Sequence, residues 1–274
     1  PVIPRDIHAR YSKGHSYCAA GFRYSGGHRL KLLILADGAV GKRVFDWLAA
    51  DWLSDVSLLV TTGEGALKTE AERLGIPVVT FLSDAQVVSD CAELGVKPDL
   101  GLLAWWPKLI GTALLNLPVA GFVNTHPSLL PYNRGKHYNF WALVEQAPFG
   151  VSLHRVNAGV DSGEVVAQRV IPYGWEDTGK SLYEKAAEAM FDLVVDTYPT
   201  LRSLDFTSWP QPPGGSFHLA SEIEAASEIH LDQTYTGREL LNLLRARSFR
   251  PHPGCWFRDS GEEYEVRIEI GKRR

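Results

Sequence analysis

The sequence predicts an α/β protein built on a Rossmann-like, mostly parallel sheet. Two patterns support this fold class. Short apolar runs typical of buried strands recur through the first half of the chain, and stretches with helical spacing separate them. Strands that alternate with helices at this spacing form parallel sheets, because each helix crosses back over one face of the sheet. A small helix and a β-hairpin are expected near the C-terminus, packed on the main domain because they are too small to fold alone.

The expected elements follow one another along the chain. The expected strands are 30–36, 56–60, 77–80, 99–103, 119–123, 150–156 and 164–171. The expected helices are 42–50, 67–74, 84–94 and 180–204, the last with a clear apolar stripe. A long irregular loop is expected over 129–135. Near the C-terminus, a helix is expected at 236–247, followed by hairpin strands at 254–257 and 264–270.

The first turn, Asp37–Gly41, invites comparison with phosphate-binding loops. It matches neither G-x-G-x-x-G nor G-x-x-x-x-G-K-[ST], because Ala36 and Arg43 occupy required positions. We therefore expect a plain connection between strand and helix rather than an ATP or NAD site. Free amides at the helix N-terminus could still contact a substrate phosphate.

These patterns divide the chain into four expected parts. They are an N-terminal extension (1–29), a catalytic domain (30–204), a connector (205–234) and a small helix-and-hairpin unit (235–274). The extension has no apolar core of the kind found in secretory signals. The connector contains Trp209-Pro-Gln-Pro-Pro-Gly-Gly and little periodicity.

Composition restricts the location and the partners. The 274 residues are 45% hydrophobic with a net charge of −4, which supports a large core and argues against a nucleic-acid surface. No apolar run approaches the ~20 residues needed to span a bilayer. Cys18, Cys91 and Cys255 show no paired spacing, as expected for ordinary thiols in a reducing compartment. We expect a cytoplasmic protein with no metal site and with no nucleic-acid or membrane partner.

Three polar residue types gather between positions 124 and 163. Asn124 and His126 stand two residues apart after an apolar run, so an extended backbone points both side chains to one face. Asp161 lies between Gly159 and Gly163, which lets the carboxylate approach a ligand closely. An amide donor beside an imidazole suits acyl transfer, in which an oxyanion develops and a proton moves. The simpler alternative is a strand that ends in a proline turn, with Asn124 bonded to its own backbone.

The combined motif resembles a known family. Asn124-Thr-His126-Pro-Ser-Leu-Leu-Pro131, then Arg134-Gly135, His154 and Asp161-Ser-Gly163, is similar to the signature of 10-formyltetrahydrofolate-dependent formyltransferases. The resemblance covers roughly residues 31–200. It implies the formyltransferase fold, with Asn124, His126 and Asp161 as the catalytic trio. We expect Asn124 and His126 to donate to the formyl oxygen, and Asp161 to position or charge His126 and to help take the proton from the attacking amine. For His154, a strand position that faces the core or a neighbouring polar group and a chemical role both remain open.

The resemblance also implies a donor site. In the family, the segment after the fourth strand wraps the pterin, which places the folate against Trp105, Trp106, Lys108, Leu109 and Ile110, with Asp161 beside it. Packing beneath the loop is the alternative for at least one tryptophan. The implied co-substrate is 10-formyltetrahydrofolate, and no metal is required.

Two further segments resemble the nucleotide-sugar N-formyltransferases, a subfamily that includes GDP-perosamine and dTDP-4-amino-4,6-dideoxyglucose N-formyltransferases. They are Asn133–Trp141 and Leu244–Gly254. The implied acceptor is the amine of a dTDP- or GDP-linked 4-amino-4,6-dideoxyhexose, with a 3-amino sugar as the weaker expectation. The product would be an N-formyl sugar for surface polysaccharide such as the O-antigen of lipopolysaccharide, and the implied assembly is a homodimer. The implied substrate-binding residues are Arg134, Gly135, Lys136, Tyr138, Asn139, Arg245, Arg247, Phe249 and Trp256.

The C-terminal arginines have two interpretations. Arg245 and Arg247 could bind a pyrophosphate through paired donors, with Phe249 or Trp256 against the base. They could equally be a pair of cations that complements the dipole at a helix C-terminus.

Other acceptors and functions remain as alternatives. A glycinamide ribonucleotide enzyme would carry a Gly-Ser-Gly-type loop where this chain has Asp37–Gly41, and a methionyl-tRNA enzyme would carry a larger basic C-terminal barrel. A 10-formyltetrahydrofolate hydrolase would use water as the acceptor and usually has an added regulatory domain. A catalytically silent binding module would have no need of all three residues of the trio.

Overall fold

The computed structural model describes residues 29–273 and contains a seven-stranded sheet in the order β3-β2-β1-β4-β5-β7-β8. The expectations for residues 1–28 and for Cys18 lie outside the described residues. The strands are β1 (Leu32–Ala36), β2 (Val56–Thr61), β3 (Val78–Thr80), β4 (Leu100–Ala104), β5 (Phe122–His126), β7 (Gly150–Arg155) and β8 (Val165–Val170). Strands β1 to β5 pair in parallel, and β7 and β8 continue the sheet antiparallel. The predicted α/β class with a mostly parallel sheet is confirmed.

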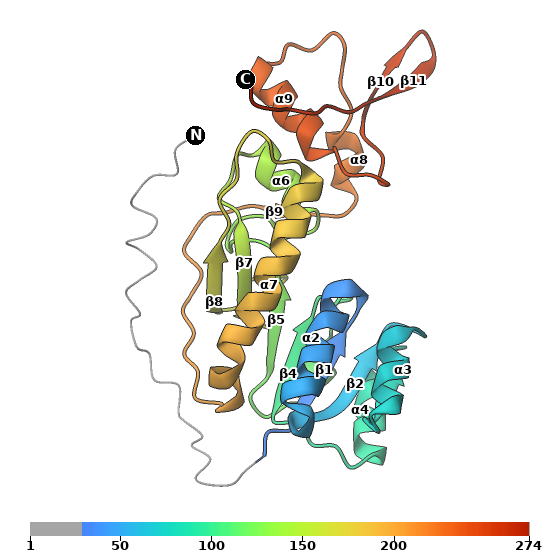
Figure 1. Cartoon of the computed structure of the whole chain (residues 1–274), viewed down its shortest axis with the longest axis vertical. Helices are drawn as coiled ribbons and strands as arrows, with labels where there is room; N and C mark the ends of the chain where they lie inside the picture. Colours follow the sequence, from blue (N-terminus) through green and yellow to red (C-terminus); the bar gives the residue numbers. More distant parts are fainter. Residues whose placement is uncertain (1–28, 274) are drawn as a thin grey trace.

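Helices cover both faces of this sheet (Figure 1). The helices of the main domain are α2 (Gly38–Asp51), α3 (Ala66–Arg73), α4 (Asp84–Glu93), α5 (Thr112–Leu115), α6 (Tyr138–Val144) and α7 (Gly179–Arg202). Two more, α8 (Glu222–Ala226) and α9 (Gly237–Ala246), lie in the C-terminal part, away from the sheet (Figure 1). One apolar core joins α2 and α7 to the sheet, and a second joins α4 and α5 to the opposite face. Alternate residues of β1 supply the two cores, since successive side chains of a strand point to opposite faces.

The first helix begins four residues earlier than the sequence pattern indicated. Helix α2 starts at Gly38, because the Asp37 side chain accepts the Gly38 N–H at 2.7 Å and caps the helix. The expected turn over Asp37–Gly41 is therefore the first turn of the helix. Asp37 also accepts a hydrogen bond from the Thr62 hydroxyl at 2.8 Å, which ties this cap to the end of β2.

The strand that carries Asn124 and His126 also differs from the expectation. It runs over Phe122–His126 rather than 119–123, because residues 119–121 form the turn that enters it, with Gly121 N–H bonded to Pro118. Both polar residues therefore belong to the strand itself. Sheet hydrogen bonds hold their backbones, so the directions of their side chains are fixed.

Two segments expected to be irregular contain regular structure. The loop over 129–135 ends in the short strand β6 (Arg134–Gly135), and α6 follows where no element was expected. The connector contributes β9 (Phe217–His218), which pairs with β6, and the helix α8. Pairing across about eighty residues leaves no local periodicity, so the pattern of the sequence could not show it.

The C-terminal unit has the expected helix and hairpin. Helix α9 is capped by Thr236, whose hydroxyl accepts the Glu239 N–H while the Glu239 side chain accepts the Thr236 N–H. The hairpin strands are β10 (Cys255–Asp259) and β11 (Glu262–Val266), so the second strand ends four residues before the expected limit. Helix α9 packs against α6 and α7, which attaches this unit to the main domain.

A close contact between β4 and β5 fixes the position of the strand that bears the polar pair. Gly101 is paired in register with Phe122, and a Cβ added at Gly101 would lie 2.2 Å from the Phe122 ring. Phe122 is fully buried at the start of β5. The absence of a side chain at position 101 therefore allows the ring to lie over β4.

We predict that Gly101→Ala lowers the free energy of unfolding by about 1–3 kcal/mol, because the buried Phe122 ring must move out of a filled core. Urea denaturation measures this change. Gly63→Ala is the matched control, since a Cβ there meets no atom within 4 Å. Equal denaturation midpoints for the two variants would contradict the prediction.

Candidate active site

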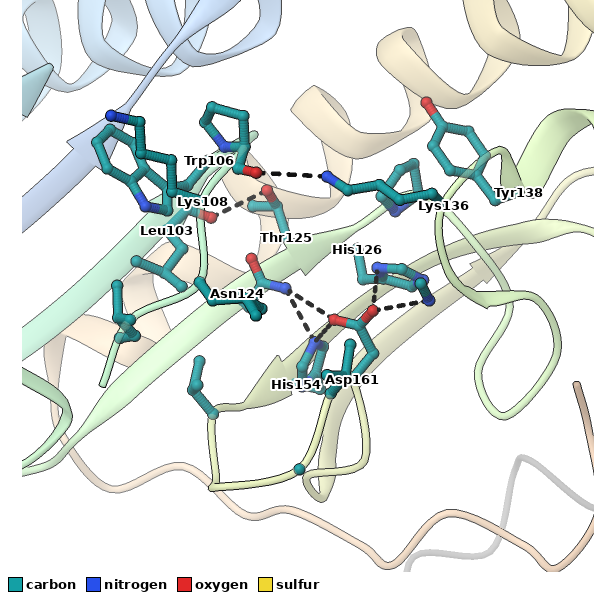
Figure 2. Close-up of a pocket in the computed structure, with 18 of the residues that line it drawn as sticks. Leu103, Trp106, Lys108, Asn124, Thr125, His126, Lys136, Tyr138, His154 and Asp161 are labelled. Atoms are coloured by element: carbon teal, nitrogen blue, oxygen red, sulfur yellow. Dashed lines mark hydrogen bonds and ion pairs between the residues drawn. The ribbon is translucent and has the colours of Figure 1, made fainter. Parts of the chain in front are cut away.

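Asn124, His126 and Asp161 converge at one place in the fold (Figure 2). Asn124 and His126 project from β5, and Asp161 arrives from the loop that joins β7 to β8. The Asp161 Oδ2 atom lies 3.4 Å from His126 Nδ1, and Oδ1 lies 3.5 Å from Asn124 Nδ2. Asp161 therefore contacts both of the other side chains implied by the motif.

The loop that carries Asp161 is held tightly. A Cβ at Gly163 would lie 1.7 Å from the Arg155 carbonyl oxygen, so only glycine fits there. Asp161 itself has φ +48°, in the left-handed region. The Gln211 side chain, from the connector, donates to the carbonyl oxygens of Asp161 at 2.7 Å and Gly163 at 2.8 Å. The carboxylate is thus presented from a fixed backbone.

Asp161 is ionised in this setting. Burial alone would raise its pKa, but the neighbouring His126 and the Gly135 N–H, which donates to Oδ2 at 3.0 Å, outweigh burial. The pKa of the Asp161 carboxyl is therefore held well below its usual range. A carboxylate that accepts several hydrogen bonds keeps its charge at neutral pH even when it is shielded from water.

The pKa of His126 is also lowered, but here burial is the cause. Burial lowers the pKa of the His126 imidazole, and the charge of Asp161 opposes this only in part. The ring is therefore neutral at pH 7. Its Nε2 atom lies 3.4 Å from the Asn133 carbonyl oxygen and its Nδ1 faces Asp161, so both ring nitrogens point at oxygen acceptors.

His154 belongs to the same cluster. Its side chain is buried on β7, which pairs with β5 so that His154 stands opposite Asn124. The Nδ1 atom lies 2.9 Å from the Arg155 carbonyl oxygen, which places a proton on Nδ1 and lets Nε2 accept from the Asn124 amide. Asn124 Nδ2 donates to that Nε2 at 3.1 Å. Of the alternatives left open by the sequence, the structure places His154 against the polar trio rather than in an apolar core.

A cavity of about 450 Å³ opens over this cluster. Its size is that of a small-molecule site. The residues expected to bind folate line it, as do three of those expected to bind the acceptor; they are Trp105, Trp106, Lys108, Leu109, Ile110, Gly135, Lys136 and Tyr138. Lys136 Nζ lies 3.4 Å from the Pro107 carbonyl oxygen and so bridges two walls of the cavity (Figure 2).

The two adjacent tryptophans have different environments. Trp106 is nearly buried, against Phe81, whereas Trp105 is half-buried against Tyr138 and Tyr183. Trp105 has φ +57°, and its N–H donates to the Thr125 hydroxyl, which fixes the start of the loop to β5. Both interpretations from the sequence therefore apply, since both tryptophans line the cavity and Trp106 also packs beneath the loop.

Six residues expected at the acceptor site do not line the cavity. They are Arg134, Asn139, Arg245, Arg247, Phe249 and Trp256. Arg245 is buried and donates to the Asp177 carbonyl oxygen at 3.1 Å, and Arg247 donates to the Ser227 hydroxyl at 2.8 Å. Asn139 donates to the Gly179 carbonyl oxygen at 2.8 Å. These three side chains hold the C-terminal unit and α6 in place.

Two parts of the cavity wall were not anticipated. Residues 157–160 precede Asp161, and residues 217–220 come from the connector. Phe217–His218 enters the wall through the β6–β9 pairing, which no local sequence pattern announces. The sequence offered one signal for this wall, namely that Phe217 and Leu219 are apolar residues in a segment without helical or strand periodicity.

Within residues 29–273, no group of three or more His, Cys, Asp or Glu side chains is arranged to hold a metal ion. Over the same span, no helix has the length and apolar character required to cross a membrane.

A family model supplies the assignment. Residues 33–197, more than half of the chain, match the family described as formyl transferase. The chain belongs to the formyl transferase family. Residues 222–272 match a second model, described as the N-formyltransferase dimerization C-terminal domain. The second match begins within the segment expected as the connector.

Known formyltransferases resemble the chain over part of their lengths. A methionyl-tRNA formyltransferase from Roseobacter denitrificans is 30% identical over 194 residues, which cover 69% of this chain and 61% of that protein. A dTDP-4-amino-4,6-dideoxyglucose formyltransferase from Mycobacterium bovis is 28% identical over 149 residues, which cover 54% of this chain and 64% of that protein. The chain therefore spans less than two thirds of the length of either relative.

Solved formyltransferase structures share the fold. A 4-N formyltransferase from Francisella tularensis superposes with a TM-score of 0.76 at 22% identity, covering 90% of this chain and 100% of that one. An N-formyltransferase from Helicobacter canadensis, solved with folinic acid and dTDP-3-aminofucose, gives a TM-score of 0.64 at 17% identity, covering 81% of each chain.

We predict that His126 titrates below the ordinary imidazole pKa of about 6.5, because burial disfavours the charged ring. In Asp161→Asn the pKa should fall further, since the carboxylate that stabilises the charged ring is gone. Nitrogen-15 NMR of the imidazoles measures both values, with His126→Gln to assign the signal. An unchanged or higher His126 pKa in Asp161→Asn would contradict this account.

Proposed function

We propose that this chain transfers the formyl group of 10-formyltetrahydrofolate to the amine of a nucleotide-linked amino-deoxysugar. The favoured acceptor is a dTDP- or GDP-linked 4-amino-4,6-dideoxyhexose, ahead of a 3-amino sugar. The observation that carries the proposal is the buried, ionised Asp161 beside a neutral His126 and the Asn124 amide, at the base of a small-molecule cavity.

The reaction needs a proton acceptor for the attacking amine. The amine nitrogen bonds to the formyl carbon and loses a proton, and the bond from that carbon to N10 of the folate breaks as N10 gains one. Both nitrogens of His126 face acceptors, so a second proton on the ring would meet either Asp161 or the Asn133 carbonyl oxygen. We assign the proton transfer to the His126–Asp161 pair. This differs from the role as a second donor to the formyl oxygen that the family resemblance implied.

The reaction also needs a donor for the developing oxyanion. Asn124 Nδ2 has two hydrogens, and His154 Nε2 holds one of them at 3.1 Å. The other has only a long contact of 3.5 Å with Asp161 and is available to the formyl oxygen. Loss of a donor of this kind typically slows turnover ~10²–10³-fold.

The choice of a sugar acceptor draws on the relatives. The M. bovis relative carries the name of a dTDP-amino-sugar formyltransferase, and the H. canadensis structure holds a dTDP-amino sugar. Methionyl-tRNA is the second candidate, because the R. denitrificans relative carries that name at 30% identity. An N-formyl sugar produced here would serve the assembly of surface polysaccharide, such as O-antigen.

We predict that the protein adds one formyl mass to a single nucleotide sugar in a panel of candidate acceptors. Mass spectrometry would follow dTDP- and GDP-linked 4-amino and 3-amino deoxysugars, glycinamide ribonucleotide and methionyl-tRNA, each with 10-formyltetrahydrofolate. His126→Ala and Asp161→Asn should lower kcat by about 10²–10⁴-fold, because proton transfer is lost. Lys272→Ala is the control, because Lys272 is exposed and does not line the cavity, and it should leave kcat unchanged.

Three results would contradict this proposal. Formylation of methionyl-tRNA alone would move the acceptor assignment to the second candidate. Formate release without any acceptor would indicate a hydrolase. Near-normal turnover of His126→Ala or Asp161→Asn would remove the assigned roles.

We further propose that the chain forms a homodimer through its C-terminal unit. Support comes from the dimerization-domain match to residues 222–272 and from large apolar side chains left exposed within that range, Leu231, Leu241 and Tyr264. Light scattering should give about twice the 30.4 kDa chain mass. Leu241→Arg should shift the mass toward the monomer, because a charge replaces an apolar contact. A monomeric wild type would contradict the proposal.

A further inference from the structure

One segment of the connector forms part of the cavity wall and is attached to the catalytic domain by its backbone. We call residues 216–220 the strap. The Arg134 N–H donates to the Ser216 carbonyl oxygen, and the Lys136 N–H donates to the His218 carbonyl oxygen, each at 3.0 Å. A Cβ at Gly135 would lie 2.2 Å from the His218 carbonyl oxygen, so the two backbones touch.

The strap is also anchored by a side chain. The His218 ring stacks on Trp141 with centroids 3.8 Å apart and an interplanar angle of 7°. Its Nε2 atom lies 2.8 Å from Glu145 Oε1, and its Nδ1 atom lies 3.1 Å from Glu222 Oε2. Glu145 also accepts a hydrogen bond from the Ser216 hydroxyl at 2.7 Å. The strap is therefore a fixed wall of the cavity.

Two apolar side chains of the strap line the cavity without being covered. Phe217 and His218 form β9, where successive side chains point to opposite faces, so Phe217 points away from the anchored ring, and Leu219 directly follows the strand. Phe217 is 42% exposed and Leu219 is 52% exposed, and both line the cavity. Uncovered apolar side chains at the rim of a small-molecule cavity mark a contact for an apolar part of the ligand.

The Phe217 ring lies close to the reacting centre. Its Cε2 atom is 3.2 Å from the place that a Cβ would take at Gly135, so the ring covers that glycine. The Gly135 N–H donates to Asp161 Oδ2 at 3.0 Å. The ring therefore lies over the peptide that contacts the carboxylate, beside the place where an amine must approach Asp161.

We propose that the strap is the acceptor wall of the cavity, and that Phe217 and Leu219 receive the apolar face of the deoxysugar. This inference rests on the proposed function and adds to it the residues that select the sugar. The donor is assigned to a different wall, residues 105–110. A deoxysugar presents C–H groups and a methyl group where other hexoses carry hydroxyls, which suits an apolar wall. The base contact expected from Phe249 or Trp256 has no counterpart in the cavity, because neither lines it.

Steady-state kinetics of strap variants tests the inference. Phe217→Ala and Leu219→Ala should each raise KM for the nucleotide sugar about tenfold or more, because apolar contact with the sugar is lost. KM for 10-formyltetrahydrofolate and kcat should stay close to wild type, since the contact is made equally before and during the reaction. Phe217→Tyr, which retains the ring, should keep a KM near wild type. Leu94→Ala is the matched control, because Leu94 is 50% exposed and lies outside the cavity.

Inhibition by the free nucleoside diphosphate shows whether Phe217 contacts the sugar or the base of the acceptor. Its inhibition constant should be the same for wild type and Phe217→Ala, because the inhibitor has no sugar to place on the ring. An inhibition constant that rises in parallel with KM would put the base on Phe217 and overturn the sugar assignment.

Other results separate this inference from the function on which it rests. A wild type that formylates no nucleotide sugar removes both. A wild type that formylates one, with strap variants that match Leu94→Ala, removes the inference alone. A rise in KM for the folate instead of the sugar also overturns it. Each variant should unfold at the same temperature as the wild type, which shows that a change in KM does not come from a loss of stability.

Discussion

The site depends on one buried negative charge. Asp161 is kept ionised away from water by contacts with Asn124 and His126 on β5 and with the Gly135 N–H on β6, two separate parts of the chain. An isolated carboxylate in such a place would take up a proton. The strands, the loop before β8 and the β6 segment must therefore all be in place before the charge is stable. Formation of the site and completion of the fold are coupled through this carboxylate.

The same charge organises its neighbours. With Asp161 ionised, His126 gains a partner that favours its charged form, although burial keeps the ring neutral at rest. Asn124 is oriented by the Nε2 atom of His154, whose own proton is directed to the Arg155 carbonyl oxygen. The amide is thus aligned by a hydrogen bond behind it, away from the place of the substrate. Such preorganisation avoids the cost of reorienting dipoles during the reaction.

The fold class and the trio could be predicted from the sequence because both have local signals. Buried strands produce apolar runs, and Asn124, His126 and Asp161 stand in a compact motif. The misplaced start of α2 shows the limit of periodicity, since the turn added by the Asp37 cap contains Gly38 and Gly41 and has the composition of a loop. The acceptor wall had no local signal, because Phe217 reaches the cavity through pairing with a distant strand. Arg245 and Arg247 matched a family segment, yet their burial depends on carbonyl and hydroxyl partners that a sequence does not display.

The connector is attached to the main domain at two points. Gln211 holds the loop of Asp161, and five residues later the strap pairs with β6. A stretch that resembles a variable linker is therefore fixed in length between these two points. Insertions in most surface loops are tolerated over evolution, as they would be at the turn between β10 and β11. Between Gln211 and Ser216, a single added residue would shift either the loop of Asp161 or the cavity wall, so the length of this proline- and glycine-rich segment should be conserved across relatives.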